Sequence, residues 1–118
     1  MRALVITFLL AAGPAIAADP DDGQRVFRSQ CTNCHAVAPG RNGVEPSLAG
    51  LIGRKAGSVP GFRYSPANQA ADITWSAAAL DPYLLEPKAA MPGTTMVYAR
   101  VKGAGPRADL IAYLETLE

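Results

Sequence analysis

The 118-residue sequence has little of several residue types on which common functions depend. It contains one histidine and only two cysteines, which are too few for a framework of disulfides. Eleven Lys and Arg side chains against ten Asp and Glu give a net charge of +1, so no basic field indicates nucleic-acid binding. The length excludes two ordinary domains, and a hydrophobic content of 49% is typical of a folded chain. We therefore expect one small folded domain that does not bind nucleic acid.

An apolar run near the N-terminus is too short for a good membrane span, which needs about 20 apolar residues. Residues 3–10 are almost all apolar, follow a positive charge, and precede the helix-breaking Gly13-Pro14. With the small residues that end at Ala17, this layout is typical of a secretory signal peptide; a transmembrane anchor is the weaker alternative. We expect residues 1–17 to be removed after Ala17. Residues 18–118 would then form a mature domain without a membrane anchor, in the periplasm.

Helix signals are short and widely spaced, and the eleven glycines and ten prolines interrupt the rest of the chain. Asp19, Ser65 and Ser76 are suitable N-caps, and Pro20 suits a first helical position. Helices are expected over residues 20–30, 66–71, 77–85 and 106–117, with 36–63 as loop. Pro82 would kink the third helix or begin it again, and Pro87 would end it. Without alternating strand patterns, the fold class is all-α. So small a core usually needs an additional stabilising element, such as a disulfide, a metal or a cofactor.

A bound cofactor can provide this stabilisation. The sequence contains Cys31-Thr32-Asn33-Cys34-His35, and Cys-x-x-Cys-His is the attachment signal for c-type haem. Each thiol would form a thioether with a haem vinyl group, and His35 would face the iron. A redox-active disulfide would need a βαβ scaffold, and zinc would need four ligands. A structural disulfide across two residues would be strained. Covalent haem is the favoured interpretation.

The second axial ligand of the iron is limited by composition. His35 is the only histidine, so ligation by two histidines of this chain is excluded. Met91, Met96, a lysine or an open position remain. A thioether would favour ferrous iron and raise the reduction potential, whereas a methionine can also simply fill a gap in the core.

Ordered sequence blocks over residues 20–117 resemble the class I c-type cytochromes, which include the mitochondrial protein and its bacterial periplasmic relatives. The blocks are Gly23-x-x-x-Phe27, Cys31 to His35, Pro46 to Gly57, Pro60 to Tyr64, Asn68, Ile73 to Trp75, Tyr83-Leu84, Pro87-Lys88, Pro92 to Met96, and Asp109 to Leu114. The resemblance implies short helices and long loops wrapped around one covalent haem. It also implies a monomeric electron carrier rather than an enzyme.

The resemblance also implies the roles of individual residues. Met96 would be the second axial ligand beside His35, which leaves Met91 to packing. The carbonyl of Pro46 would accept the His35 Nδ1 proton and so orient the ring. The remaining haem-binding residues would be Tyr64 and Trp75 at a buried propionate with Arg54 nearby, and Asn68, Tyr83 and Thr94 in a polar network beside the Met96 sulfur. Gly23, Phe27, Leu110 and Tyr113 would form a close crossing of the first and last helices.

The sequence departs from the mitochondrial pattern in ways that concern partners. Pro82 places the geometry of Tyr83 in doubt, and Tyr98 replaces a phenylalanine beside the haem. Where the mitochondrial proteins carry lysines, this chain has Gln30, Ala89, Thr95 and Gly103; the cations Lys88, Lys102 and Arg28 remain. Docking should therefore depend less on charge and more on apolar contact through Val37, Met91 and Val97.

The expected partners are a respiratory oxidase, a photosynthetic reaction centre or a periplasmic dehydrogenase, each bound transiently. Two other classes of function stay open. A small haem peroxidase or gas binder would need an open sixth position on the iron, and a dedicated subunit of a redox complex would dock more firmly.

Overall fold

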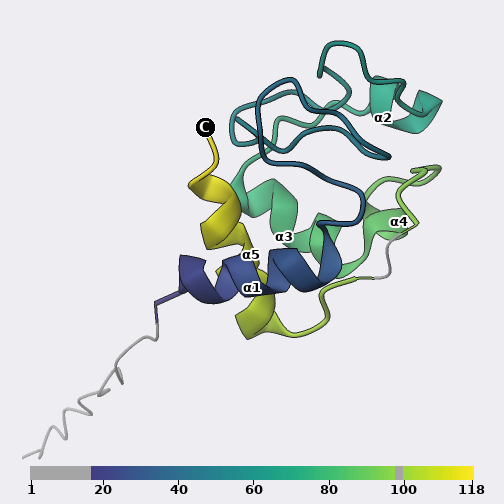
Figure 1. Ribbon diagram of the computed structural model, residues 1–118. Coiled ribbons are helices and arrows are strands. Elements are labelled where there is room, and N and C mark those ends of the chain that lie inside the picture. The colour runs from purple at the N-terminus through teal and green to yellow at the C-terminus, as the bar shows by residue number, and fades with distance from the viewer. Residues whose placement is uncertain (1–16, 98–99) are drawn as a thin grey trace, which may run out of the picture.

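The computed structural model describes residues 17–97 and 100–118 of the chain. The predicted signal peptide therefore lies outside the described residues except for Ala17, and so does Tyr98. Within the described ranges the chain forms helices and loops with one isolated bridge, between Lys55 and Thr74, and no strand. The helices are α1 (Pro20–Gln30), α2 (Pro66–Ala70), α3 (Ala77–Leu85), α4 (Pro87–Ala90) and α5 (Ala104–Glu115), as Figure 1 shows. The all-α prediction is confirmed.

Helix α1 begins and ends as its sequence predicts. The Asp19 carboxylate accepts a hydrogen bond from the backbone N–H of Asp21, and Pro20 occupies the first turn. The helix ends at Gln30, where the backbone N–H of Cys31 donates to the Phe27 carbonyl at 2.8 Å. This ending fixes the haem-attachment motif directly after a rigid element.

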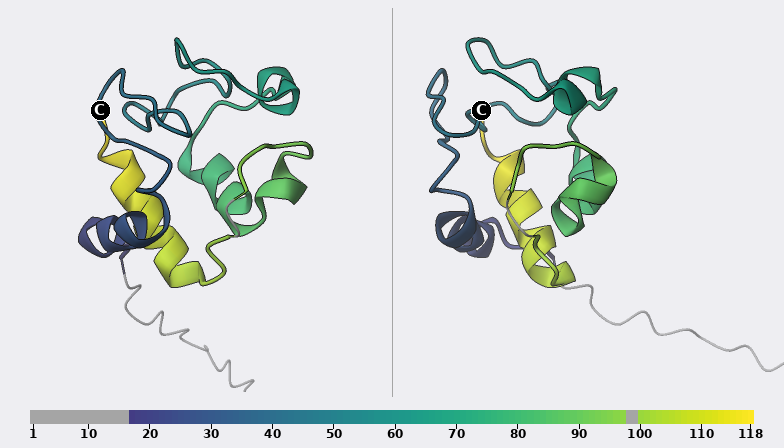
Figure 2. Two further views of the ribbon diagram at one scale, coloured as in Figure 1. Left: turned by 45° about the vertical axis from the view of Figure 1, so that its right-hand side comes forward. Right: turned by 90° about the vertical axis from the view of Figure 1, so that its right-hand side faces the viewer.

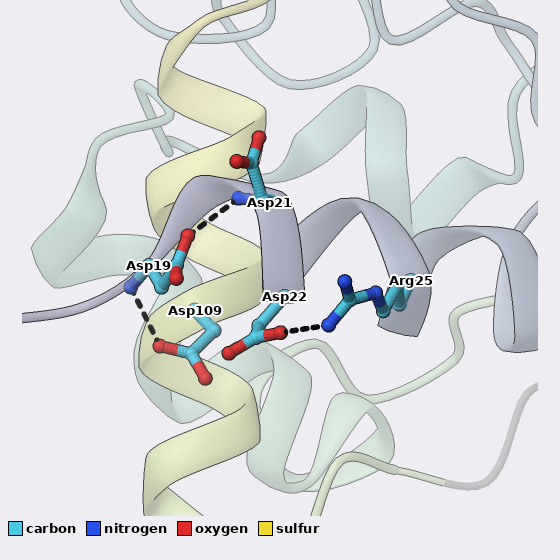
Figure 3. Close-up of polar contacts among 5 residues, drawn as sticks. All are labelled: Asp19, Asp21, Asp22, Arg25 and Asp109. Atoms are coloured by element: carbon cyan, nitrogen blue, oxygen red, sulfur yellow. Dashed lines mark hydrogen bonds and ion pairs between the residues drawn. The ribbon is translucent and has the colours of Figure 1, made fainter.

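Helices α1 and α5 cross in close contact, which the different views of Figures 1 and 2 both show. Gly23 is buried at this crossing, and the rings of Phe27 and Tyr113 lie 5.4 Å apart. Figure 3 shows the polar edge of the contact, where the Asp19 backbone N–H donates to an Asp109 carboxylate oxygen at 2.8 Å. The predicted crossing of the first and last helices is confirmed.

Helix α5 begins two residues before the predicted start at Pro106 and ends two residues before the predicted end at Leu117. Pro106 is tolerated inside the first turn because the first N–H groups of a helix have no intrahelical partner.

Helices α3 and α4 follow one another at Glu86. Ser76 caps α3 through the backbone N–H of Ala79, and α3 continues through Pro82 without restarting. Pro87 was expected only to end this helix, but it also occupies the first turn of α4. The fixed φ of proline suits a helix start, which explains the additional short helix.

The long loop between α1 and α2 is held against the chain that precedes α3. The backbone N–H of Trp75 donates to the Arg54 carbonyl, and the N–H of Ala56 donates to the Ile73 carbonyl. These bonds place Arg54 and Trp75 side by side. The buried hydrophobic core comprises Phe27, Leu51, Ala56, Trp75, Leu80, Tyr83, Met91, Val101, Leu110, Ile111 and Leu114. None of the described helices has the length and apolar character needed to cross a membrane.

Candidate haem site

The motif that follows α1 forms a tight backbone turn. The N–H groups of Cys34 and His35 both donate to the Cys31 carbonyl, at 3.1 and 2.9 Å. Cys31, Cys34 and His35 are half-buried and line one cavity, whereas Thr32 and Asn33 are exposed. The spacing therefore directs both thiols and the imidazole toward the same space.

This cavity has a volume of about 250 Å³ and is mostly apolar. Leu48, Leu51, Leu80, Val101 and Leu114 contribute much of its apolar wall. All the residues predicted to bind haem line it as well: Cys31, Cys34, His35, Pro46, Arg54, Tyr64, Asn68, Trp75, Tyr83, Thr94 and Met96. The structure thus brings together side chains that the sequence spreads over some sixty positions, and their individual roles remain predictions.

The Cys31 thiol is poorly suited to thiol–disulfide exchange. Burial, followed by the proximity of Cys34, raises the pKa of Cys31 to about 11. Redox-active Cys-x-x-Cys motifs depend on a lowered pKa, because the thiolate is the nucleophile. The described residues also hold no group of three or more His, Cys, Asp and Glu side chains that could bind a metal ion. Both observations disfavour the disulfide and zinc alternatives.

The ring of His35 is fixed by the chain that follows the motif. Its Nδ1 lies 2.7 Å from the Pro46 carbonyl oxygen, which can only accept a hydrogen bond. The proton therefore resides on Nδ1, and the lone pair of Nε2 is left for a metal. Burial lowers the pKa of His35, with a further lowering from Arg54, while the bond to Pro46 opposes both. A neutral imidazole is the form that ligates iron.

Met96 and Met91 lie in different environments. Met91 is only 3% exposed and belongs to the core, whereas Met96 is half-buried and lines the cavity. Met91 therefore packs, and the expectation that it takes part in surface docking is wrong. The turn before Met96 depends on Gly93, whose φ of +88° suits glycine.

The hydroxyl of Tyr83 donates to the Met96 sulfur at 3.7 Å, and the Met96 backbone N–H donates to the Thr94 hydroxyl. Pro82 therefore does not displace the tyrosine from the sulfur. Burial raises the pKa of Tyr83, so the phenol keeps its proton and stays a donor.

A polar group of side chains stands elsewhere on the cavity wall. Arg54 donates through Nη1 to the carbonyls of Ser47 and Ala49, at 2.9 and 3.0 Å. The Tyr64 hydroxyl accepts from the backbone N–H of Val59. Among the described residues, Asn68 Oδ1 is a buried side-chain oxygen without a hydrogen-bond partner, which is a costly arrangement.

Sequence reasoning missed Glu45 and Val44, which also line the cavity. Burial raises the pKa of the Glu45 carboxyl. Val44 and Val97 are 73% and 89% exposed, so apolar side chains stand where the cavity meets solvent. Only one feature of the sequence could have indicated that Glu45 lines the cavity: its position directly before Pro46.

The cavity fits a c-type haem in its chemistry. It is apolar, as a large flat macrocycle requires, and it offers two thiols and an imidazole nitrogen from one motif. It also contains a thioether, and a guanidinium that can pair with a carboxylate. A small apolar ligand would use none of the polar groups.

Comparisons with known proteins also indicate a protein that carries c-type haem. Residues 18–114 match the family model described as cytochrome c oxidase, cbb3-type, subunit III. Cytochrome c2 of Blastochloris viridis is 46% identical over 98% of this chain and 93% of its own length. Cytochrome c type-1 of Ascaris suum is 47% identical over 82% of this chain and 87% of its own length.

Among solved structures, cytochrome cH from Methylobacterium extorquens superposes with a TM-score of 0.78 at 37% identity. That alignment covers 84% of this chain and 99% of the other. Fold, sequence and attachment motif agree, so the chain belongs to the class I c-type cytochromes, electron-transfer proteins rather than enzymes, and Cys31 and Cys34 hold its haem c covalently.

Proposed function

We propose that the chain is a soluble periplasmic carrier that takes single electrons from one redox partner to another, with His35 and Met96 as the axial ligands of its haem. The observation that carries the ligand assignment is that the oriented imidazole of His35 and the thioether of Met96 line the same cavity. The haem iron supplies the one-electron chemistry when it is bound. The chain's own residues bind, orient and shield that group.

Each residue has a defined task under this proposal. Cys31 and Cys34 anchor the haem, and the Pro46 carbonyl holds the His35 ring with its Nε2 lone pair available. Tyr83 directs its hydroxyl at the Met96 sulfur and so restricts the rotamers of the thioether. Arg54, Tyr64, Trp75 and Asn68 surround the polar periphery, while the apolar wall excludes water. A preformed, rigid shell of this kind needs little rearrangement when the charge of its contents changes.

The exposed rim of the cavity is the proposed docking surface. Val44 and Val97 combine cavity contact with high exposure, and Val37 is 37% exposed. Lys88, Lys102 and Arg28 are exposed cations. A small surface of this composition suits the transient interfaces of electron-transfer partners, here a respiratory oxidase, a photosynthetic reaction centre or a periplasmic dehydrogenase. Residues 1–17 would direct the chain to the periplasm as a cleaved signal peptide.

The test is expression in a periplasm that attaches c-type haem, followed by optical spectra of the purified protein in both redox states. Haem stain that stays with the polypeptide on a denaturing gel, together with spectra of a six-coordinate haem with histidine and sulfur ligands, would support the proposal. A ferrous protein that binds carbon monoxide as rapidly as an open haem would instead favour a gas binder or a peroxidase. Elution only within a larger complex would favour a dedicated subunit.

A further inference from the structure

Arg107 is a charged side chain buried within the fold. Only 10% of the side chain is exposed, although α5 carries it near the helix start. Its Nε donates to a carboxylate oxygen of Asp81 on α3 at 2.6 Å. Its Nη1 donates to the carbonyls of Val101 and Lys102, each at 3.1 Å. Three hydrogen bonds from one guanidinium thus join α5, α3 and the chain that leads into α5.

The two carbonyls belong to the segment that follows Met96. Val101 is buried and lines the cavity, and its backbone N–H donates to the Leu84 carbonyl at 2.9 Å. On the other side of Met96, Met91 is buried and its N–H donates to the Pro87 carbonyl. The described residues on the two sides of Met96 are therefore fixed at Met91 and at Val101–Lys102.

The contacts of Met96 itself are weaker than those at the loop ends. Its backbone N–H reaches the Thr94 hydroxyl at 3.3 Å and its sulfur lies 3.7 Å from the Tyr83 hydroxyl, while the next residue, Val97, is 89% exposed. Burial of a charge is unfavourable unless hydrogen bonds compensate it, so the position of Arg107 is stable only while the carbonyls of Val101 and Lys102 stay in place.

We propose that Arg107 is a positioning residue for the axial ligand: by fixing Val101 and Lys102, it holds the segment that keeps Met96 in the haem cavity. This inference rests on the proposed ligation by Met96. Lysine cannot replace the guanidinium, because its single ammonium group cannot reach an Asp81 oxygen and two carbonyls with the same fork of donors.

The experiment measures imidazole binding to the ferric holoprotein, since imidazole must displace Met96 to reach the iron. The apparent affinity equals the intrinsic affinity multiplied by the fraction of molecules in which the position is open. Arg107→Lys should raise the apparent affinity by about tenfold or more, which corresponds to about 1.4 kcal/mol. Asp81→Asn, at a half-exposed carboxylate, should raise it less while leaving the fold intact.

Arg100→Gln is the matched control. Arg100 lies in the same segment and forms an ion pair with Glu86, but both side chains are well exposed. An exposed ion pair contributes little, so imidazole affinity should not change. An increase equal to that of Arg107→Lys would mean that loss of any side-chain contact near this segment has the effect, which would overturn the proposal.

Repeating the substitutions in a Met96→Ala background completes the test. With the position already open, Arg107→Lys should no longer alter imidazole affinity. If Met96→Ala alone leaves the affinity unchanged, the ligation by Met96 fails, and the role of Arg107 fails with it. If Met96→Ala raises the affinity while Arg107→Lys and Asp81→Asn do not, only the role of Arg107 fails. A lower free energy of unfolding without altered affinity would likewise make Arg107 purely structural.

Discussion

Gly23 of α1 lies so close to Asp109 of α5 that a Cβ atom on Gly23 would stand 1.9 Å from the Asp109 carbonyl oxygen. The same Cβ atom would be 2.9 Å from the Cβ of Tyr113. Backbone atoms cannot move aside as a flexible side chain can, so any larger residue must separate the two helices.

Gly23→Val should therefore destabilise the holoprotein by about 3 kcal/mol or more, at or above the upper end of the usual range for overpacking. Denaturant unfolding measures the change. Gly105→Ala is the control, because a Cβ atom there meets nothing within 4 Å and lies inside α5, where alanine is the better helix former. Equal stability of Gly23→Val and the native chain would mean that the helices do not cross at Gly23.

The two methionines should respond in opposite ways to substitution. Met96→Ala should open the iron's sixth position, so that the ferrous protein binds carbon monoxide readily, and should lower the reduction potential because the thioether is lost. Met91→Leu should leave the spectrum unchanged and alter stability by less than about 1.5 kcal/mol, since the swap nearly conserves volume in the core. Optical titration with carbon monoxide and potentiometry check both. The reverse pattern would assign the ligand to Met91.

Glu45 should make the protein less stable as the pH rises. Burial raises the pKa of its carboxyl above the ordinary value of 4.5. Between 4.5 and that raised pKa the folded state binds more protons than the unfolded state, so the free energy of unfolding falls as the pH increases through this window. Glu45→Gln removes the charge and should stabilise the protein at pH 7.

This gain in stability should largely vanish at pH 4, where the carboxyl is protonated in the folded state. Denaturant unfolding of the variant and the native chain at both pH values checks the prediction. A gain of the same size at pH 4 would show that the amide acts through packing rather than through charge.

Docking should depend only weakly on salt. Without residues 1–17 the chain carries ten basic and ten acidic side chains, and the charge of Arg100 is offset by its ion pair with Glu86. The bimolecular rate of electron transfer with a partner should fall only gently as ionic strength rises, because little charge steers the encounter.

Lys88→Gln together with Lys102→Gln should flatten this dependence further. Arg25→Gln, which removes a cation on α1 already paired with Asp22 (Figure 3), is the control and should have little effect. Stopped-flow kinetics at several salt concentrations give the slopes. A steep dependence in the native chain, or a double variant that matches it at low salt, would contradict the prediction.

The sequence predicted the fold well where local signals decide it. Asp19 and Pro20 determine the start of α1, and the motif at Cys31 indicates the cofactor without any knowledge of the loops. The residues that line the cavity could be predicted only from the resemblance of ordered sequence blocks to the family. Local patterns carry no information on which distant loops meet.

What the sequence did not predict depends on contacts between distant segments. Pro87 can follow the end of one helix and also begin another. Only the packing of the surrounding chain determines that it does both here. Arg107 stands in an amphipathic pattern that gives no sign of burial, because its partner Asp81 lies on another helix. Glu45 has no periodic context at all. A charged residue becomes informative only when its partners in space are known.

The contact between Asp19 and Asp109 joins residues that are 90 positions apart. Among the described helices, α1 packs against α5, so a growing chain can complete this packing only after its last helix has been synthesised. Closing so long a loop also slows folding compared with pairing of neighbouring segments. Until that contact forms, the cavity that Leu110 and Leu114 of α5 help to line is incomplete, so the thiols of Cys31 and Cys34 are not yet enclosed.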